Sequence, residues 1–161
     1  MTNLAEIQEG LTLNTATPAS ETTFRVRYAE TDRMGIVHHA AYVVWLEEGR
    51  SHYIRAQGHS YTQFEQEGIS LAVSELHVRY GQAARYDQLV TVCCWVEEVK
   101  SRQITFGYEV VAVETGDLLA TARSKHICVN RQGKVTTIPS RWRQLWEGAI
   151  CEDGDHEAAT A

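Results

Sequence analysis

Apolar positions follow two different periods along this chain, one of strands and one of helices. Phe24, Val26 and Tyr28 alternate with Arg25 and Arg27, which predicts a first, half-buried strand. Four later segments alternate or are rich in β-forming residues, and turn-forming residues separate them. We therefore predict four further antiparallel strands, at 69–80, 89–99, 104–113 and 118–129.

Between the first two predicted strands, apolar residues recur at steps of three and four, which predicts a long helix. It begins near His38 to Ala40 and stops at Gly58, and Gly49 lies inside it. Because a glycine there costs about 1 kcal/mol relative to alanine, we expect a close approach of the helix to a flat sheet at this point. Short helices are predicted at 61–67 and 140–146. The apolar helical positions are Tyr42, Trp45, Leu46, Gly49, Tyr53 and Ala56.

These elements predict an α+β fold in the order β-α-β-β-β-β, with an antiparallel sheet of five or six strands wrapped around one long central helix. The strand at 104–113 has one row of side chains on each face, and one of these rows is apolar. If the other row packs inward, the apolar side chains are left in water. Association of subunits would cover them, so we expect a homodimer or a homotetramer. The row in question is Ile104, Phe106, Tyr108 and Val110.

A length of 161 residues fits one domain at 22–148, with a flexible extension at 1–21 and an acidic, flexible tail at 149–161. The formal net charge of -6 argues against nucleic acid as a partner. No apolar run reaches the ~18 residues of a membrane span, and the first ten residues do not resemble a secretion signal. We expect a cytoplasmic protein without membrane insertion, with Cys93, Cys94, Cys128 and Cys151 reduced.

The segment from the first strand to the helix carries the candidate chemistry. Asp32 lies just ahead of the helix start, where unpaired backbone N–H groups and partial positive charge can stabilise an oxyanion. This pairing indicates acyl-group chemistry, although a carboxylate in such a loop is more often a cap or a turn former. His38 and His39 do not predict a metal site, because neighbouring helical residues diverge by about 100°.

The order of residues in this segment strongly resembles a motif of the hotdog-fold acyl-CoA thioesterases, in the 4-hydroxybenzoyl-CoA thioesterase and YbgC/FadM-like group. The resemblance covers about residues 23–148 and implies a hotdog fold. One departure is Ala41, where the family has an asparagine. The matching positions are Tyr28, Glu30, Thr31, Asp32, Gly35, Ile36, Val37, His39 and Tyr42.

The resemblance implies hydrolysis of a CoA thioester to a free acid and CoA, without metal or organic cofactor, at a site on a subunit interface. Asp32 would be the nucleophile or the general base, and the His39 backbone N–H would polarise the carbonyl. Gly35 would form the turn that lets the loop approach the thioester. Glu30 is interpreted as a structural hydrogen-bonding group rather than a second catalytic acid.

Substrate contacts are predicted with less support. Tyr42 would belong to the helix core first and line the acyl pocket second, and cationic side chains would bind the CoA phosphates. The resemblance implies a nucleotide on the surface near strand ends, so Arg102, at a hairpin, is the first choice. The other candidates are Arg79, Arg85 and Lys125. The main alternative is a non-catalytic acyl-CoA-binding hotdog protein, against which the Asp-x-x-Gly loop speaks. A hotdog hydratase would require a different Asp/His loop.

Overall fold

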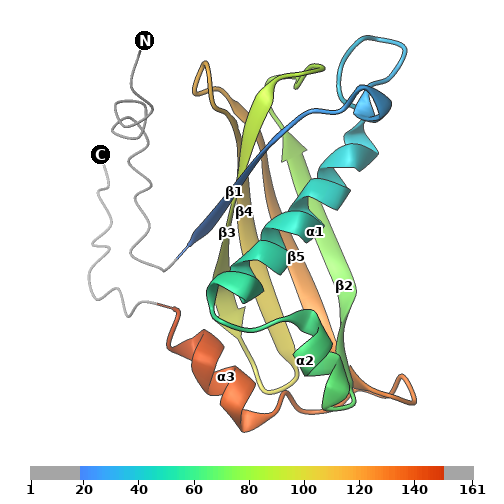
Figure 1. The fold of residues 1–161 in the computed structure, drawn as a ribbon. Coiled ribbons are helices and arrows are strands. Elements are labelled where there is room, and N and C mark those ends of the chain that lie inside the picture. Colours follow the sequence, from blue (N-terminus) through green and yellow to red (C-terminus); the bar gives the residue numbers. More distant parts are fainter. Residues whose placement is uncertain (1–18, 151–161) are drawn as a thin grey trace, which may run out of the picture.

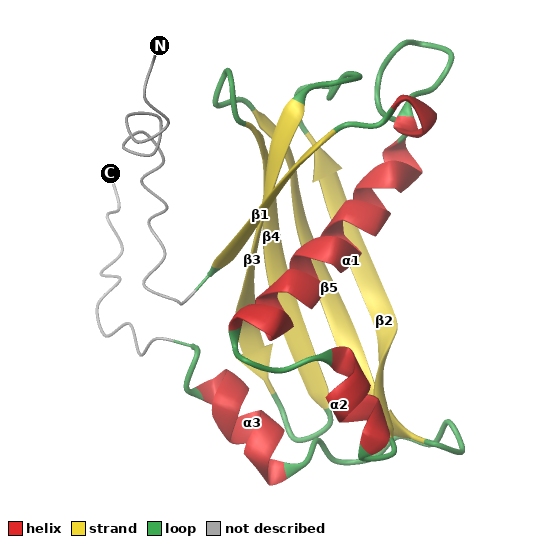
Figure 2. Ribbon diagram, in the orientation of Figure 1, coloured by secondary structure: helices red, strands yellow, loops and turns green. Residues whose placement is uncertain are grey.

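The computed structural model describes residues 19–150, which form one antiparallel sheet of five strands, in the order β1-β3-β4-β5-β2, with a long helix across one face (Figures 1 and 2). The predicted α+β fold and order of elements are confirmed. The elements are β1 (Ser20–Arg25), a 3₁₀ turn (Tyr28–Glu30), α1 (His39–Ala56), α2 (Tyr61–Gln66), β2 (Ile69–Tyr80), β3 (Leu89–Val99), β4 (Gln103–Ala112), β5 (Leu118–Asn130) and α3 (Ser140–Glu147).

The first strand differs from its prediction at both ends. It begins at Ser20, inside the segment assigned to the extension, and ends at Arg25. Tyr28 lies in the 3₁₀ turn and is 77% exposed, because the Glu30 carboxylate accepts a hydrogen bond from the Arg27 backbone N–H at 2.8 Å and closes the turn. Segments 1–18 and 151–161, with most of the predicted extension and tail and with Cys151, lie outside the described residues.

Helix α1 lies against the sheet at Gly49, as the sequence predicts. A Cβ atom at this position would lie 2.6 Å from Cγ1 of Val92 on β3, closer than real atoms approach. The helix then ends at Gln57, and Gly58 follows with a φ of +82°, a conformation that glycine adopts without strain. The glycine at position 49 therefore fixes how closely α1 lies against the sheet.

The apolar row of β4 faces α1. These side chains therefore do not need a second subunit to cover them, and the expectation that they do is wrong. All four are at most 1% exposed, whereas the opposite row, with Gly107 and Glu109, forms the outer face. Edge strand β2 carries some of the exposed apolar side chains, including Val73, which is 56% exposed, and Leu76, which is 40% exposed. The buried row is Ile104, Phe106, Tyr108 and Val110.

The described cysteines are free, as expected, and all three are buried. Cys94 packs in the core under α1, and its neighbour Cys93 lies on the opposite face of β3. Burial raises the pKa of the Cys93 thiol to about 12, with a smaller contribution from Glu21 and Glu109. This thiol is therefore protonated and unreactive at neutral pH.

A chain of polar groups crosses the core beneath α1. The Tyr108 and Ser124 hydroxyls lie 2.7 Å apart, and Ser124 Oγ lies 2.7 Å from Nε2 of His126. His126 is fully buried, and its Nδ1 has no hydrogen-bond partner within residues 19–150. Burial, followed by the positive charge of Arg50, lowers the pKa of His126 to about 3.

This pKa predicts a loss of stability in mild acid. His126 stays neutral in the folded state, whereas the unfolded chain takes up the proton below about pH 6.5. The contribution of His126 to the free energy of unfolding is therefore complete above that pH. It falls by up to about 1.4 kcal/mol per pH unit down to about pH 3. In urea titrations between pH 7 and pH 4, His126→Gln should lose stability less steeply than the wild type.

His77→Gln, at an exposed histidine on β2, is the matched control and should keep the wild-type slope. An unchanged slope in His126→Gln would contradict the assignment.

Candidate active site

The loop between the 3₁₀ turn and α1 is held in a tight hairpin-like conformation. Thr31 and Val37 form an isolated antiparallel bridge. Within the loop, Asp32 N–H donates to the Ile36 carbonyl at 2.8 Å, and Gly35 N–H donates to the Asp32 carbonyl at 3.0 Å. Gly35 has a φ of +74°, which explains the glycine at this turn.

The segment between β2 and β3 fastens this loop to the helix. Val37 N–H donates to the Ala84 carbonyl at 2.8 Å, and Ala84 N–H donates to the Tyr42 hydroxyl at 3.3 Å. Ala84 is 1% exposed, so both bonds are shielded from water. The sequence offers no signal for this role, because it depends on backbone groups that meet only in the fold.

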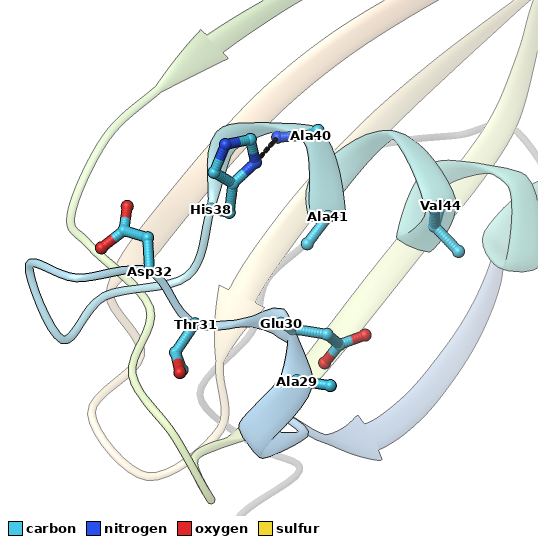
Figure 3. Close-up of a pocket in the computed structure, with 8 residues that line it drawn as sticks. All are labelled: Ala29, Glu30, Thr31, Asp32, His38, Ala40, Ala41 and Val44. Atoms are coloured by element: carbon cyan, nitrogen blue, oxygen red, sulfur yellow. Dashed lines mark hydrogen bonds between the residues drawn. The ribbon is translucent and has the colours of Figure 1, made fainter.

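Glu30 stabilises the loop and does not face the same way as Asp32. Its carboxylate accepts hydrogen bonds from Nε1 of Trp45 at 2.9 Å and from the backbone and side chain of Arg27. Burial alone would raise its pKa, but these hydrogen bonds outweigh burial and hold the pKa below its ordinary value. Its side chain points away from Asp32, on the side of Val44 (Figure 3). The structure thus gives Glu30 the structural role predicted for it.

The Asp32 carboxylate remains accessible. One oxygen, Oδ1, accepts a hydrogen bond from Met34 N–H at 2.7 Å, and the side chain is partly exposed. It borders an open pocket of about 530 Å³ between the loop and the first turns of α1 (Figure 3). The other residues that line this pocket are Ala29, Glu30, Thr31, His38, Ala40, Ala41 and Val44.

The start of α1, where His38, Ala40 and Ala41 line this pocket, leaves one backbone donor free. The N-cap is His38, whose Nδ1 accepts from Ala40 N–H at 3.1 Å, and Ala41 N–H donates to the His38 carbonyl at 2.9 Å. The hydrogen bonds of residues 19–150 include no acceptor for the His39 N–H. Because partial positive charge gathers at a helix start, this free donor suits a developing oxyanion.

The two neighbouring histidines lie closer than expected. Their ring centroids are 4.2 Å apart, and the expected divergence of 100° does not apply because His38 is the N-cap and only His39 is helical. Since Nδ1 of His38 accepts a hydrogen bond, its proton is on Nε2. Within the described part of the chain, no three His, Cys, Asp or Glu side chains are grouped to hold a metal ion.

Two tyrosines support the helix start, Tyr80 from β2 and Tyr42 from the first turns of α1 itself. The Tyr80 hydroxyl, at the end of β2, donates to the His39 carbonyl at 2.9 Å, a contact that the sequence does not predict. Tyr42, predicted as a pocket wall, is 3% exposed and packs edge-to-face against Tyr80. In one chain it therefore supports the site from within the core, and its contact with the acyl group stays a prediction.

The predicted CoA-binding side chains are scattered within one chain. Arg85 lies in the segment that fastens the loop, and Arg79 precedes Tyr80 near the same end of the sheet. Arg102 is at the β3–β4 turn, at the opposite end, about 30 Å away along β3 (Figure 1). Lys125 forms an ion pair with Glu75 at 2.8 Å. Arg102 and Lys125 are therefore not brought to the Asp32 pocket by this chain.

Known proteins resemble this chain over most of its length. Residues 26–145 match the model of the Thioesterase-like superfamily. YneP of Bacillus subtilis strain 168 is 36% identical over 113 residues, which are 70% of this chain and 81% of YneP. The acyl-CoA thioesterase YbgC of Haemophilus influenzae is 34% identical over 107 residues, 66% of this chain and 77% of the relative.

A solved structure, the DHNA-CoA thioesterase from Staphylococcus aureus, superposes with a TM-score of 0.73 at 33% identity and covers 81% of this chain and 87% of that one. The fold and the family match confirm the expected class, a hotdog-fold thioesterase. The chain belongs to the Thioesterase-like superfamily.

The Glu30 hydrogen bonds predict a measurable contribution to stability. Glu30→Gln keeps the shape of the side chain but removes the charge that Trp45 and Arg27 bind, and it should lower the free energy of unfolding by about 1–2 kcal/mol. Urea denaturation measures the change.

Glu48→Gln, on an exposed pair with Arg55, is the control and should change stability by less than about 0.5 kcal/mol. Equal effects of the two substitutions would show that Glu30 does not have this role.

Proposed function

We propose that this protein hydrolyses acyl-CoA thioesters to a free carboxylic acid and CoA. The supporting observation is that the accessible Asp32 carboxylate borders a pocket at the start of α1, the helix terminus that carries the free His39 N–H. Membership of the Thioesterase-like superfamily and the acyl-CoA thioesterase name of a relative with 34% identity support the same reaction.

In the proposed reaction, the thioester carbonyl oxygen accepts a hydrogen bond from the His39 N–H. Asp32 either attacks the carbonyl carbon or removes a proton from an attacking water. In the first route the C–S bond breaks, the thiolate of CoA leaves and gains a proton, and water then hydrolyses the acyl–Asp32 anhydride to release the acid and restore the carboxylate. In the second route water adds to the carbonyl carbon, the C–S bond breaks, and the thiolate leaves with the proton taken from the water. One such oxyanion donor typically contributes about 10²- to 10³-fold in rate.

This chemistry requires no metal or organic cofactor, because a thioester carbonyl is electrophilic and thiolate is a good leaving group. Gly35 supports it by letting the loop turn tightly next to the pocket. A non-catalytic acyl-CoA-binding protein is the alternative. The free helix-start donor favours catalysis, since a ligand sensor does not need an unpaired N–H beside a carboxylate.

We also propose that two copies of the chain pair through β2. This strand is an edge of the sheet, and it exposes Val73 and Leu76 on the face that α1 covers elsewhere. Unpaired edge strands with apolar side chains readily pair with a second strand. A β2–β2 pair would give the expected homodimer, or half of a homotetramer, and would enclose the open pocket.

The cellular location of the protein was predicted from the sequence alone. Among the helices of residues 19–150, none combines the length and apolar character that a bilayer crossing requires. The cytoplasmic location stays a prediction.

Asp32→Asn tests the proposed chemistry. It keeps the size of the side chain but removes its basicity and charge, so kcat/KM for thiol release from a panel of aromatic and short-, medium- and long-chain acyl-CoAs should fall at least about 100-fold. Glu98→Gln, at an exposed pair with Lys100 near the opposite end of the sheet, is the control and should match the wild type. Wild-type turnover in Asp32→Asn would refute the role of Asp32.

Val73→Lys tests the proposed assembly. A lysine on an edge strand opposes strand pairing, so sedimentation velocity should show a dimer or tetramer for the wild type and monomers for this variant. Val135→Lys changes a side chain of similar exposure, 54%, outside the strands, and it should assemble normally. A Val73→Lys variant that still assembles would rule out pairing through β2.

A further inference from the structure

Arg50 is a cationic side chain of α1 that contacts the series of hydrogen-bonded polar side chains in the core. Its Nε donates to the Tyr61 hydroxyl at 2.7 Å, and an Nη donates to the Tyr108 hydroxyl at 3.3 Å. Tyr108 continues to Ser124 on β5. The guanidinium is thus held in a fixed orientation, partly buried between α1, α2 and the sheet.

This charge has no acidic partner among the described residues. None of their ion pairs includes Arg50, and Glu48, nearby on the same helix, pairs instead with Arg55 at 2.7 Å. Hydroxyl groups solvate a guanidinium but do not neutralise it. Since a partly buried charge without a counter-ion is costly, a fixed arginine of this kind suits an anionic ligand.

Exposed apolar side chains of α1 and of β2, the strand proposed to pair with a second copy, lie between the start of α1 and Arg50. On β2, Tyr80 contacts the helix start, and Leu76 and Val73 follow on the same face, 40% and 56% exposed. Leu76 pairs across the sheet with Ser124, which belongs to the Arg50 network. Val43 and Arg50 are seven residues apart and thus share one side of α1, where Val43 is 41% exposed.

We propose that Arg50 binds a carboxylate at the distal end of the acyl group, so that the enzyme prefers CoA thioesters of dicarboxylic acids. The apolar surface of β2 and α1 contacts the methylene chain, and the guanidinium, held by Tyr61 and Tyr108, forms a charge-assisted hydrogen bond with the free carboxylate. This inference rests on the proposed thioesterase function.

The spacing along α1 sets the length of the acyl chain. His39 and Arg50 are eleven residues apart, which is about 16 Å along a helix. Helical side chains lean toward the N-terminus, so the guanidinium lies roughly 10–16 Å from the oxyanion donor. A hydrogen bond takes up about 3 Å at each end, so at about 1.2 Å per bond of an extended chain the remaining distance corresponds to roughly four to nine carbons.

The experiment compares two series of substrates. Thiol release is measured with acyl-CoAs of about four to twelve carbons, each as the simple acyl-CoA and as the ω-carboxyacyl-CoA of the same length. For the wild type, kcat/KM should be roughly 10- to 100-fold higher for the carboxylated member at the best length, the range expected for a hydrogen bond to a charged group. A wild type that releases thiol from both series without this preference overturns the inference.

Arg50→Met should bring the ratio of the two kcat/KM values to about one, and Tyr61→Phe, which frees the guanidinium, should reduce it. A purely structural role of Arg50 would lower both series together and leave the ratio unchanged, which overturns the inference. Arg55→Met, on the exposed side of α1, is the matched control and should keep the wild-type ratio. Release from no acyl-CoA would instead refute the thioesterase function itself.

Discussion

The close packing of α1 on β3 is the contact on which the site depends. At Gly49 there is no room for a Cβ atom, because Cγ1 of Val92 would lie 2.6 Å from it. The helix therefore lies against the sheet, and its first residue, His39, comes to the end of the sheet where the Asp32 loop leaves β1 (Figure 1). The glycine lowers helix propensity by about 1 kcal/mol, and burial of the helix face offsets this cost.

Two carboxylates two residues apart have different surroundings and thus different roles. Glu30 accepts three hydrogen bonds from Arg27 and Trp45, so groups of the protein already stabilise its negative charge. Within residues 19–150, Asp32 receives one donor, the Met34 N–H, and it borders the pocket. The segment around Ala84 holds the loop in place. In the folded loop, Glu30 therefore has a structural role, whereas Asp32 remains accessible.

Local periodicity was enough to predict the helix, four strands and the close approach at Gly49, and the ordered motif was enough to predict the family. Alternation alone could not tell which row of β4 packs under α1, because both rows contain apolar residues. Contacts between distant segments were also beyond prediction, as with the Tyr80 hydroxyl on the His39 carbonyl. The distance of Arg102 from Asp32 was also beyond prediction, because it depends on strand direction, and the role of Arg102 in CoA binding stays a prediction.

The central claim is that the free His39 N–H and the Asp32 carboxylate act on one thioester carbonyl. A crystal structure with a non-hydrolysable acyl-CoA analogue, in which the sulfur is replaced by a methylene group, tests it most directly. The account predicts the carbonyl oxygen roughly 2.7–3.1 Å from the His39 nitrogen, with Asp32 or an Asp32-bound water facing the carbonyl carbon. A carbonyl bound elsewhere, with the His39 N–H facing solvent, would contradict it.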